Sequence, residues 1–253
     1  MKLQIIGTAS ICQKNNNASY LIDDHILIDM PSGNCTNLNK LNIKVEEIDN
    51  ILITHFHGDH FLDMPIYFIE KDKEDELLVN IYCTKPGKKK IETLTKLAFT
   101  NFAKTSLSRI ERNYNYNANF TIGSYEVSRI KVDHGEFKPA YGYVFKSDNL
   151  TVGFTGDTAY CDNVDYMASI CDYLICDCTF IYGNESHMGI DDIKKLAYKY
   201  PDHKFVTSHM ATETAKEAKK LKIKNIIVPS DGDIIISNDK KPTDRKSGEK
   251  IKE

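Results

Sequence analysis

The chain lacks the features that mark a membrane protein, an exported protein or a general nucleic-acid binder. No apolar run in its 253 residues approaches the roughly 18 residues that a membrane-spanning helix needs. The apolar stretch at 1–7 is too short for a signal peptide and is typical of a first strand. The net charge of −3 argues against a chain that binds nucleic acid through overall basic charge. We therefore expect a cytoplasmic protein without a membrane partner.

Repeats, low-complexity linkers and a disulfide framework are missing as well. Without repeats or a linker, residues 1–239 are predicted to form a single domain, and the charged segment 240–253 is predicted to be a disordered tail. The 7 cysteines are an odd number, and without an export signal they are interpreted as reduced thiols. Cys176 and Cys178 lie close together in an apolar segment, but a separate zinc site there would need further ligands.

Strand-like and helix-like segments alternate along the chain. Short strands cluster early and late with helices between them, which favours two sheets covered by helices over one doubly wound sheet. The predicted strands are 2–6, 19–23, 25–29, 50–54, 78–83, 125–132, 141–146, 150–154, 172–176, 204–207 and 225–228, and the predicted helices are 62–70, 87–104, 163–170, 190–199 and 212–221.

The most informative motif is the segment 55–60, whose sequence HFHGDH directly follows a strand-like run. Neighbouring side chains on an extended or tightly turned segment point to different sides. His55 and His57 can therefore meet at one metal ion while Asp59 and His60 reach a second. A chance surface cluster is the alternative, and with only 8 histidines in the chain it is too improbable to prefer. The motif predicts a metal site at the end of a strand.

Three more candidate ligands, His134, Asp157 and His209, each follow another strand-like run. Taken alone, either histidine could be an ordinary structural residue, and Asp157 could be a turn aspartate because it follows Gly156. Strand ends that surround one site would bring all three side chains to the first motif. Together with residues 55–60, the three therefore favour metal ligation.

The order of these motifs resembles the metallo-β-lactamase superfamily over nearly the whole chain, from Gly7 to Gly232. The resemblance implies an α+β fold, a four-layer αββα sandwich, with a two-metal site between the sheet edges. Zn²⁺ suits imidazole and carboxylate ligands, and Mn²⁺ or Fe²⁺ would accept the same set. By the resemblance, one metal is bound by His55, His57 and His134, the other by Asp59, His60 and His209, and Asp157 bridges the two.

Two later segments, 176–180 (CDCTF) and 185–192 (ESHMGIDD), resemble ribonuclease Z and related phosphodiesterases. In that branch an acid orients a histidine that protonates the leaving oxygen, and the matching positions here are Asp177 and His187. Asp177 stands where the branch usually has glutamate, so its reach is shorter. An exposed loop histidine is the alternative interpretation of His187.

The resemblance implies phosphodiester hydrolysis by a metal-bridged hydroxide that Asp59 orients, with His187 as proton donor. Ribonuclease Z carries a long tRNA-binding arm between the third histidine and the bridging aspartate. Here His134 and Asp157 are only 23 positions apart, which leaves room for one hairpin. We therefore expect a cyclic nucleotide, another small diester or an RNA end as substrate.

Several alternatives stay open. The enzyme could be a tRNA 3′ endonuclease, or an ester, thioester or lactone hydrolase that uses the same ligands, whereas the complete ligand set argues against a non-enzymatic nucleic-acid-binding module. The Lys-rich stretch 85–112 is either a solvated helical face or a phosphate-steering rim. The aromatic stretch 99–120 could form a homodimer interface, a substrate wall or an ordinary packed helix and loop.

Overall fold

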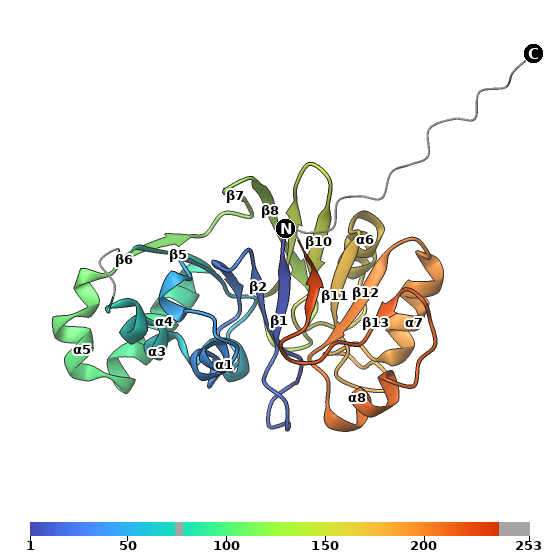
Figure 1. Ribbon diagram of the computed structural model, residues 1–253, viewed down its shortest axis with the longest axis horizontal. Helices are drawn as coiled ribbons and strands as arrows, with labels where there is room; N and C mark the ends of the chain where they lie inside the picture. The colour runs from blue at the N-terminus through green and yellow to red at the C-terminus, as the bar shows by residue number, and fades with distance from the viewer. Residues whose placement is uncertain (74–77, 238–253) are drawn as a thin grey trace, which may run out of the picture.

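Two β-sheets lie face to face, and helices cover the outer side of each (Figure 1). A computed structural model describes residues 1–73 and 78–237, and within these the sheets have seven strands each. The first sheet has the order β14 (Ile234–Ile236), β1 (Leu3–Gly7), β2 (Ser19–Ile22), β3 (Ile26–Ile28), β4 (Asn50–Leu52), β5 (Leu78–Tyr82) and β6 (Glu111–Asn115). The second has the order β13 (Ile226–Ile227), β12 (Lys204–Ser208), β11 (Tyr173–Asp177), β10 (Thr151–Phe154), β9 (Ala140–Lys146), β8 (Tyr125–Val132) and β7 (Asn119–Ile122).

The helices divide between the two sheets in chain order (Figure 1). The first sheet is covered by α1 (Asn34–Lys40), α3 (Met64–Lys71), α4 (Lys85–Ala98) and α5 (Thr100–Thr105), and the short α2 (Gly58–Phe61) lies at the end of β4. The second sheet is covered by α6 (Asp162–Ile170), α7 (Ile190–Lys199) and α8 (Thr212–Ala218). This arrangement is the four-layer αββα sandwich expected from the sequence.

Alternation of side chains along each strand produces three separate cores. In β1, Leu3 and Ile5 pack between the sheets while Ile6 faces the first helical layer. In β11, Ile175 packs between the sheets while Leu174 faces the second helical layer. Since both faces of these strands are buried, their sequences are continuous apolar runs rather than alternating ones.

Hydrogen bonds from the second sheet hold the first sheet in place near the ends of β4 and β5. The Tyr143 hydroxyl donates to the carbonyl of Ile53 at 2.9 Å, directly before the HFHGDH segment. Arg129 on β8 donates to the carbonyls of Cys83 and Tyr116, both at 2.6 Å. The two sheets therefore meet rigidly at the edge where the candidate ligands lie.

Every predicted strand and helix overlaps an observed element, but three strands and the helices α1 and α2 were not expected. Strands β6, β7 and β14 and helix α1 have polar or very short sequences that give no clear period. The predicted helix 87–104 is divided at Phe99, whose backbone is not helical (φ −138°, ψ 68°). The aromatic stretch 99–120 is therefore not simply a helix and loop, because it also contains β6 and the start of β7.

The segment predicted as a tail, 240–253, lies outside the described residues, so its disorder stays a prediction. Among residues 1–73 and 78–237, no helix is long and apolar enough to cross a membrane.

Phe154 tests the core between the sheets. It is fully buried and contacts the rings of Tyr20 and Phe145, with centroids 5.2 and 5.9 Å away. We expect Phe154→Ala to lower the free energy of unfolding by about 3–5 kcal/mol, because it removes buried surface and leaves a cavity. Urea unfolding measures the change. Tyr198→Ala, on a side chain that is 72% exposed, should stay within about 0.5 kcal/mol of the wild type, and a similar loss in both variants would contradict the prediction.

Candidate metal centre

Strand ends from both sheets bring all seven predicted ligands to one place. His55 and His57 lie in the loop after β4, and α2 carries Asp59 and His60. The other three follow strands of the second sheet: His134 follows β8, Asp157 follows β10 and His209 follows β12. They form two adjoining groups, each with ligand atoms within 4.8 Å of one another.

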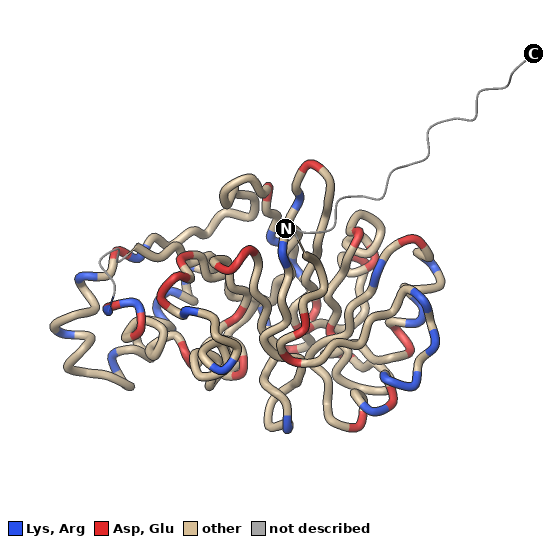
Figure 2. The backbone as a smooth tube through the Cα atoms, in the orientation of Figure 1, with Lys and Arg blue, Asp and Glu red and all other residues tan. Residues whose placement is uncertain are grey.

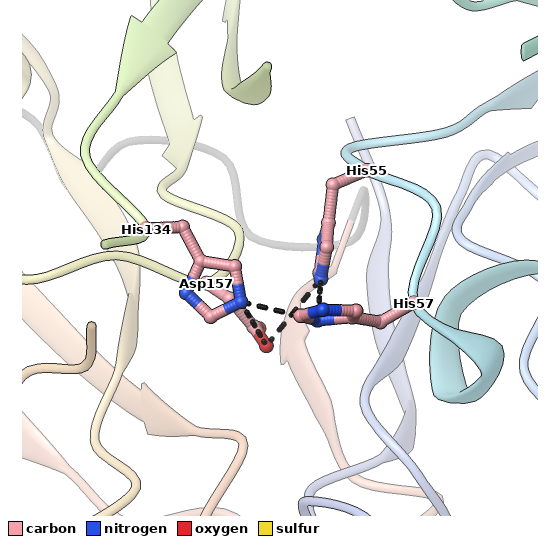
Figure 3. A group of neighbouring side chains, drawn as sticks. All are labelled: His55, His57, His134 and Asp157. Carbon is pink, nitrogen blue, oxygen red and sulfur yellow. Dashed lines mark hydrogen bonds and ion pairs between the residues drawn. The ribbon is translucent and has the colours of Figure 1, made fainter. Parts of the chain in front are cut away.

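The first group consists of His55, His57, His134 and Asp157, whose side chains point toward one another (Figure 3). His57 Nδ1 lies 3.1 Å from both His55 Nε2 and His134 Nε2. The Asp157 Oδ2 atom is 3.7 Å from His55 Nε2 and 4.0 Å from His134 Nε2. Three imidazole nitrogens facing one another and a carboxylate oxygen form the donor set that a divalent cation accepts.

The second group consists of Asp59, His60 and His209, and Asp157 lies beside it. His209 Nε2 is 3.3 Å from an oxygen of Asp59 and 3.3 Å from one of Asp157. His60 Nε2 is 3.3 Å from Asp157, yet it is buried and has no hydrogen-bond partner among the described residues. A buried nitrogen left unsatisfied between carboxylates fits a metal ligand.

Hydrogen bonds on the far side of the rings fix which nitrogen faces the centre. His60 Nδ1–H donates to Asp29 at 2.7 Å, and His134 Nδ1–H donates to the carbonyl of Ser186 at 2.8 Å. His209 Nδ1–H donates to Thr179 Oγ1 at 2.8 Å. In each case Nδ1 is occupied by a proton and Nε2 keeps its lone pair for the centre, as is usual for metal-bound histidines.

Asp29 and Thr179, which form hydrogen bonds with the candidate ligands His60 and His209, were not predicted from the sequence. Asp29 follows β3 as the ligands follow their own strands, so its position offered a signal that went unused. It also accepts hydrogen bonds from the backbone N–H (2.8 Å) and hydroxyl (2.7 Å) of Thr54. Its φ of +61° is in the left-handed region, as is the φ of +53° at His209, and such strain is concentrated at functional sites.

The surroundings favour the neutral form of His55 and His57 and the ionised form of Asp157. Burial lowers the pKa of His55 well below its ordinary value, and the nearby His60 lowers it further. Burial and the neighbouring His134 lower the pKa of His57 in the same way. For Asp157, burial opposes ionisation, but the charges of His209, His60 and His55 hold its pKa well below the usual range.

In the second group a proton competes with a metal. Burial alone would lower the pKa of His60, but the charges of Asp157 and Asp29 raise it well above its ordinary value. A cation bound at His60 Nε2 would satisfy Asp157 and replace a proton on that nitrogen, while Nδ1–H still donates to Asp29.

His187 and Asp177 form the predicted pair beside the second group. His187 Nδ1–H donates to Asp177 Oδ2 at 2.8 Å, so the shorter aspartate side chain still reaches. Asp177 also accepts from the N–H groups of Thr158 (2.9 Å) and Thr179 (3.0 Å). The His187 ring stacks on His209 with centroids 5.4 Å apart. The loop that carries His187 therefore places its ring against the candidate ligand His209 rather than in solvent.

A cavity of about 650 Å³ opens over this centre. His57, His134 and His187 line its floor, and Phe137, Phe180 and Glu185 are among the residues of its walls.

Comparison with known proteins places the chain in a family. Residues 1–229 match the family described as anti-Pycsar protein Apyc1. The chain belongs to this family. Among curated relatives, ribonuclease Z of Thermococcus kodakarensis is 23% identical over 83% of this chain and 85% of that protein.

Solved structures have the same fold. The metallo-β-lactamase fold protein YhfI of Bacillus subtilis matches with a TM-score of 0.73 and 18% identity, over 92% of this chain and 98% of that one. A diphosphatase from the PhnP family matches with a TM-score of 0.70 and 20% identity, over 93% and 97%. The protein thus has the metallo-β-lactamase fold and the ligand set of a metal-dependent hydrolase, as the sequence resemblance implied. The segment of chain between His134 and Asp157 contains the β9–β10 hairpin, as expected.

Asp29→Asn tests how far the site depends on the hydrogen bonds behind its ligands. An amide cannot accept hydrogen bonds from Thr54 and from His60 at both of its ends, so the His60 ring should lose its fixed orientation. We expect metal affinity to fall by about 10- to 100-fold, as measured by competition with a chelating dye. Asp24→Asn, which breaks only a surface ion pair with Lys2 (2.7 Å), is the control, and unchanged affinity in the Asp29 variant would refute the role.

Proposed function

We propose that the protein is a phosphodiesterase that uses two divalent metal ions to hydrolyse a small phosphodiester, with a cyclic nucleotide as the favoured substrate. The observation that carries the proposal is His187, held by Asp177 at 2.8 Å beside a double group of ligands. A dedicated proton donor is needed where the leaving group is a poor one, such as the alkoxide of a sugar. Acyl transfer from a good leaving group has no such need.

The residues fit two metal ions, and Zn²⁺ suits their imidazole and carboxylate atoms best. The first ion would be held by His55, His57 and His134, the second by Asp59, His60 and His209, and Asp157 would serve both. When bound, such ions lower the pKa of water to near neutrality and neutralise charge on a phosphoryl group.

The chain's own side chains then orient the reactants and move a proton. The Asp59 Oδ2 atom lies 3.3 Å from His209 Nε2, and the Asp59 carboxylate would orient an attacking water. Burial lowers the pKa of His187, but the hydrogen bond and charge of Asp177 more than compensate, so the net pKa is raised. The imidazolium can therefore donate its Nε2 proton to the leaving oxygen, while Nδ1 stays bonded to Asp177.

A small substrate is favoured by what surrounds the cavity. The β9–β10 hairpin occupies the position where ribonuclease Z carries its tRNA-binding arm. Basic and acidic residues are interspersed over the molecule rather than gathered in one basic track (Figure 2). In the Lys-rich stretch, Lys90 lies over the ring of Phe56, between His55 and His57 in the chain, whereas Lys88 lies over Tyr114 on β6. The second candidate substrate is an RNA end, including the tRNA 3′ end that the name of the ribonuclease Z relatives suggests. A homodimer and a cytoplasmic location stay predictions.

Hydrolysis of bis(p-nitrophenyl) phosphate tests the reaction class. We expect Zn²⁺- or Mn²⁺-loaded protein to release nitrophenol, and His57→Ala to abolish turnover because the first ion loses a ligand. Release of nitrophenol is followed by its absorbance. Absence of turnover in protein with full metal content would instead favour an ester or thioester hydrolase.

The leaving-group dependence of His187→Ala tests the proton donor. We expect unchanged metal content and a loss in kcat within the typical range of about 10²- to 10⁴-fold for an alkyl diester, because proton transfer to an alkoxide is lost. Nitrophenyl esters should lose much less, since nitrophenolate needs little protonation. His25→Ala, on a histidine bonded to the backbone of Asp23, is the control. Equal losses on both esters would remove His187 from the proton-transfer step.

A further inference from the structure

Phe180 presents a large aromatic surface to the cavity. Its side chain is 40% exposed, and it lines the cavity together with the histidines of the centre. The ring lies edge-on to His187, with centroids 5.8 Å apart and an interplanar angle of 84°. The proposed mechanism gives this ring no task, although it stands beside the proton donor.

The backbone around Phe180 is fixed. Its N–H donates to the carbonyl of Met188 (3.4 Å), and its own carbonyl accepts from Ile190 N–H (3.0 Å). This pairing requires glycine at 189, where a Cβ atom would lie 2.4 Å from the backbone nitrogen of Gly183. Because the loop is held on both sides, the ring is preorganised for contact with a ligand rather than free to collapse onto the core.

A second ring, Phe137, lines the same cavity on the side of the first ligand group. Its centroid is 3.9 Å from that of His57, and the ammonium of Lys90 lies 5.6 Å from it. A substrate whose phosphate reaches the histidines would thus have a phenyl ring near His57 and another near His187.

The charges at the rim show which part of a substrate lies there. Glu136 and Glu185 line the cavity, and neither forms an ion pair within residues 1–73 and 78–237. Two uncompensated carboxylates repel a phosphate but accept hydrogen bonds from N–H groups. The part of the cavity lined by these carboxylates is therefore suited to an uncharged flat ring that carries N–H donors.

We propose that Phe180 is a specificity-determining residue that stacks on the nucleobase of the substrate, with Phe137 as the opposite wall. The inference rests on the proposed function for the position of the phosphate. Stacking of a base on an aromatic side chain corresponds to about 5- to 150-fold in affinity. The base-dependent part of binding should therefore reside mainly in this one side chain.

Fluorescence provides a test that does not depend on turnover, because the chain contains no tryptophan. In metal-loaded protein, Phe180→Trp would introduce a single reporter in the proposed stacking position. We expect saturable quenching by adenosine 5′-monophosphate and none by ribose 5-phosphate. Tyr182→Trp is the matched control, since Tyr182 is 76% exposed and is not among the lining residues. Equal quenching by both probes, equal quenching in both variants, or no quenching would overturn the proposal.

A second variant keeps the test decisive if the reporter disturbs the loop. Phe180→Leu keeps an apolar side chain and removes the flat ring. Calorimetric titration should show an affinity for the nucleotide that is weaker by about 5- to 150-fold and a much smaller change for ribose 5-phosphate. Parallel losses for both probes would make Phe180 a structural residue only.

Turnover separates this inference from the proposed function. A 3′,5′-cyclic nucleotide is compared with the same cyclic ribose phosphate carrying a methoxyl group in place of the base. The ratio of the two kcat/KM values should fall toward one in Phe180→Leu, mainly through KM. If the wild type hydrolyses both at equal rates, the stacking role fails while the phosphodiesterase stands. If base-dependent quenching occurs without hydrolysis of any diester, the stacking role stands and the proposed phosphodiesterase activity fails.

Discussion

The crowding of imidazole nitrogens and carboxylate oxygens between the two sheets constrains the rest of the structure. In the first group, the ring nitrogen of His57 lies 3.1 Å from one nitrogen of His55 and 3.1 Å from one of His134. In the second, His60 Nε2 is buried without a hydrogen-bond partner among the described residues. Such a cluster is costly to bury unless a cation satisfies it. These atoms must also be held in position by the surrounding structure, because their contacts with one another do not stabilise the fold. Rigid strand ends, the hydrogen-bonded Tyr143 between the sheets and hydrogen bonds behind the rings of His60, His134 and His209 perform that task.

Thr179 connects the ligands with the proton donor. Its hydroxyl donates to Asp177 at 2.7 Å and accepts from His209 Nδ1–H at 2.8 Å. Asp177 in turn holds His187, so one short chain of hydrogen bonds joins a ligand of the second group to the group that would protonate the leaving oxygen. A shift of the His209 ring would therefore move the His187 ring through these hydrogen bonds, and a shift of His187 would move His209. This coupling also explains why an aspartate suffices at 177, since β11 and Thr179 bring its carboxylate close enough to reach.

The sequence predicted the parts of this arrangement that follow a strong local pattern. Continuous apolar runs located the central strands, and polar residues directly after them located all seven candidate ligands. Strands β6 and β14 could not be found this way, because they lie at sheet edges, where polar or very short sequences are stabilised by pairing with one neighbour. Asp29 and Thr179 were missed for a different reason. Their roles depend on contacts with His60 and His209, which are 31 and 30 positions away in the chain.

The walls of the cavity are built from the same segments that carry the ligands. His134 Nδ1–H donates to the carbonyl of Ser186, and a Cβ atom at Gly135 would lie 2.5 Å from Ser186 Oγ. The segment after β8 is therefore packed directly on the loop that bears Phe180 and His187. A substrate that fits between these two segments contacts Phe137, three residues after the candidate ligand His134, and Phe180 beside His187. Binding energy from a distant part of the substrate can thus be converted into alignment at the centre, which makes a ring at Phe180 a means of positioning the phosphate as well as of selecting it.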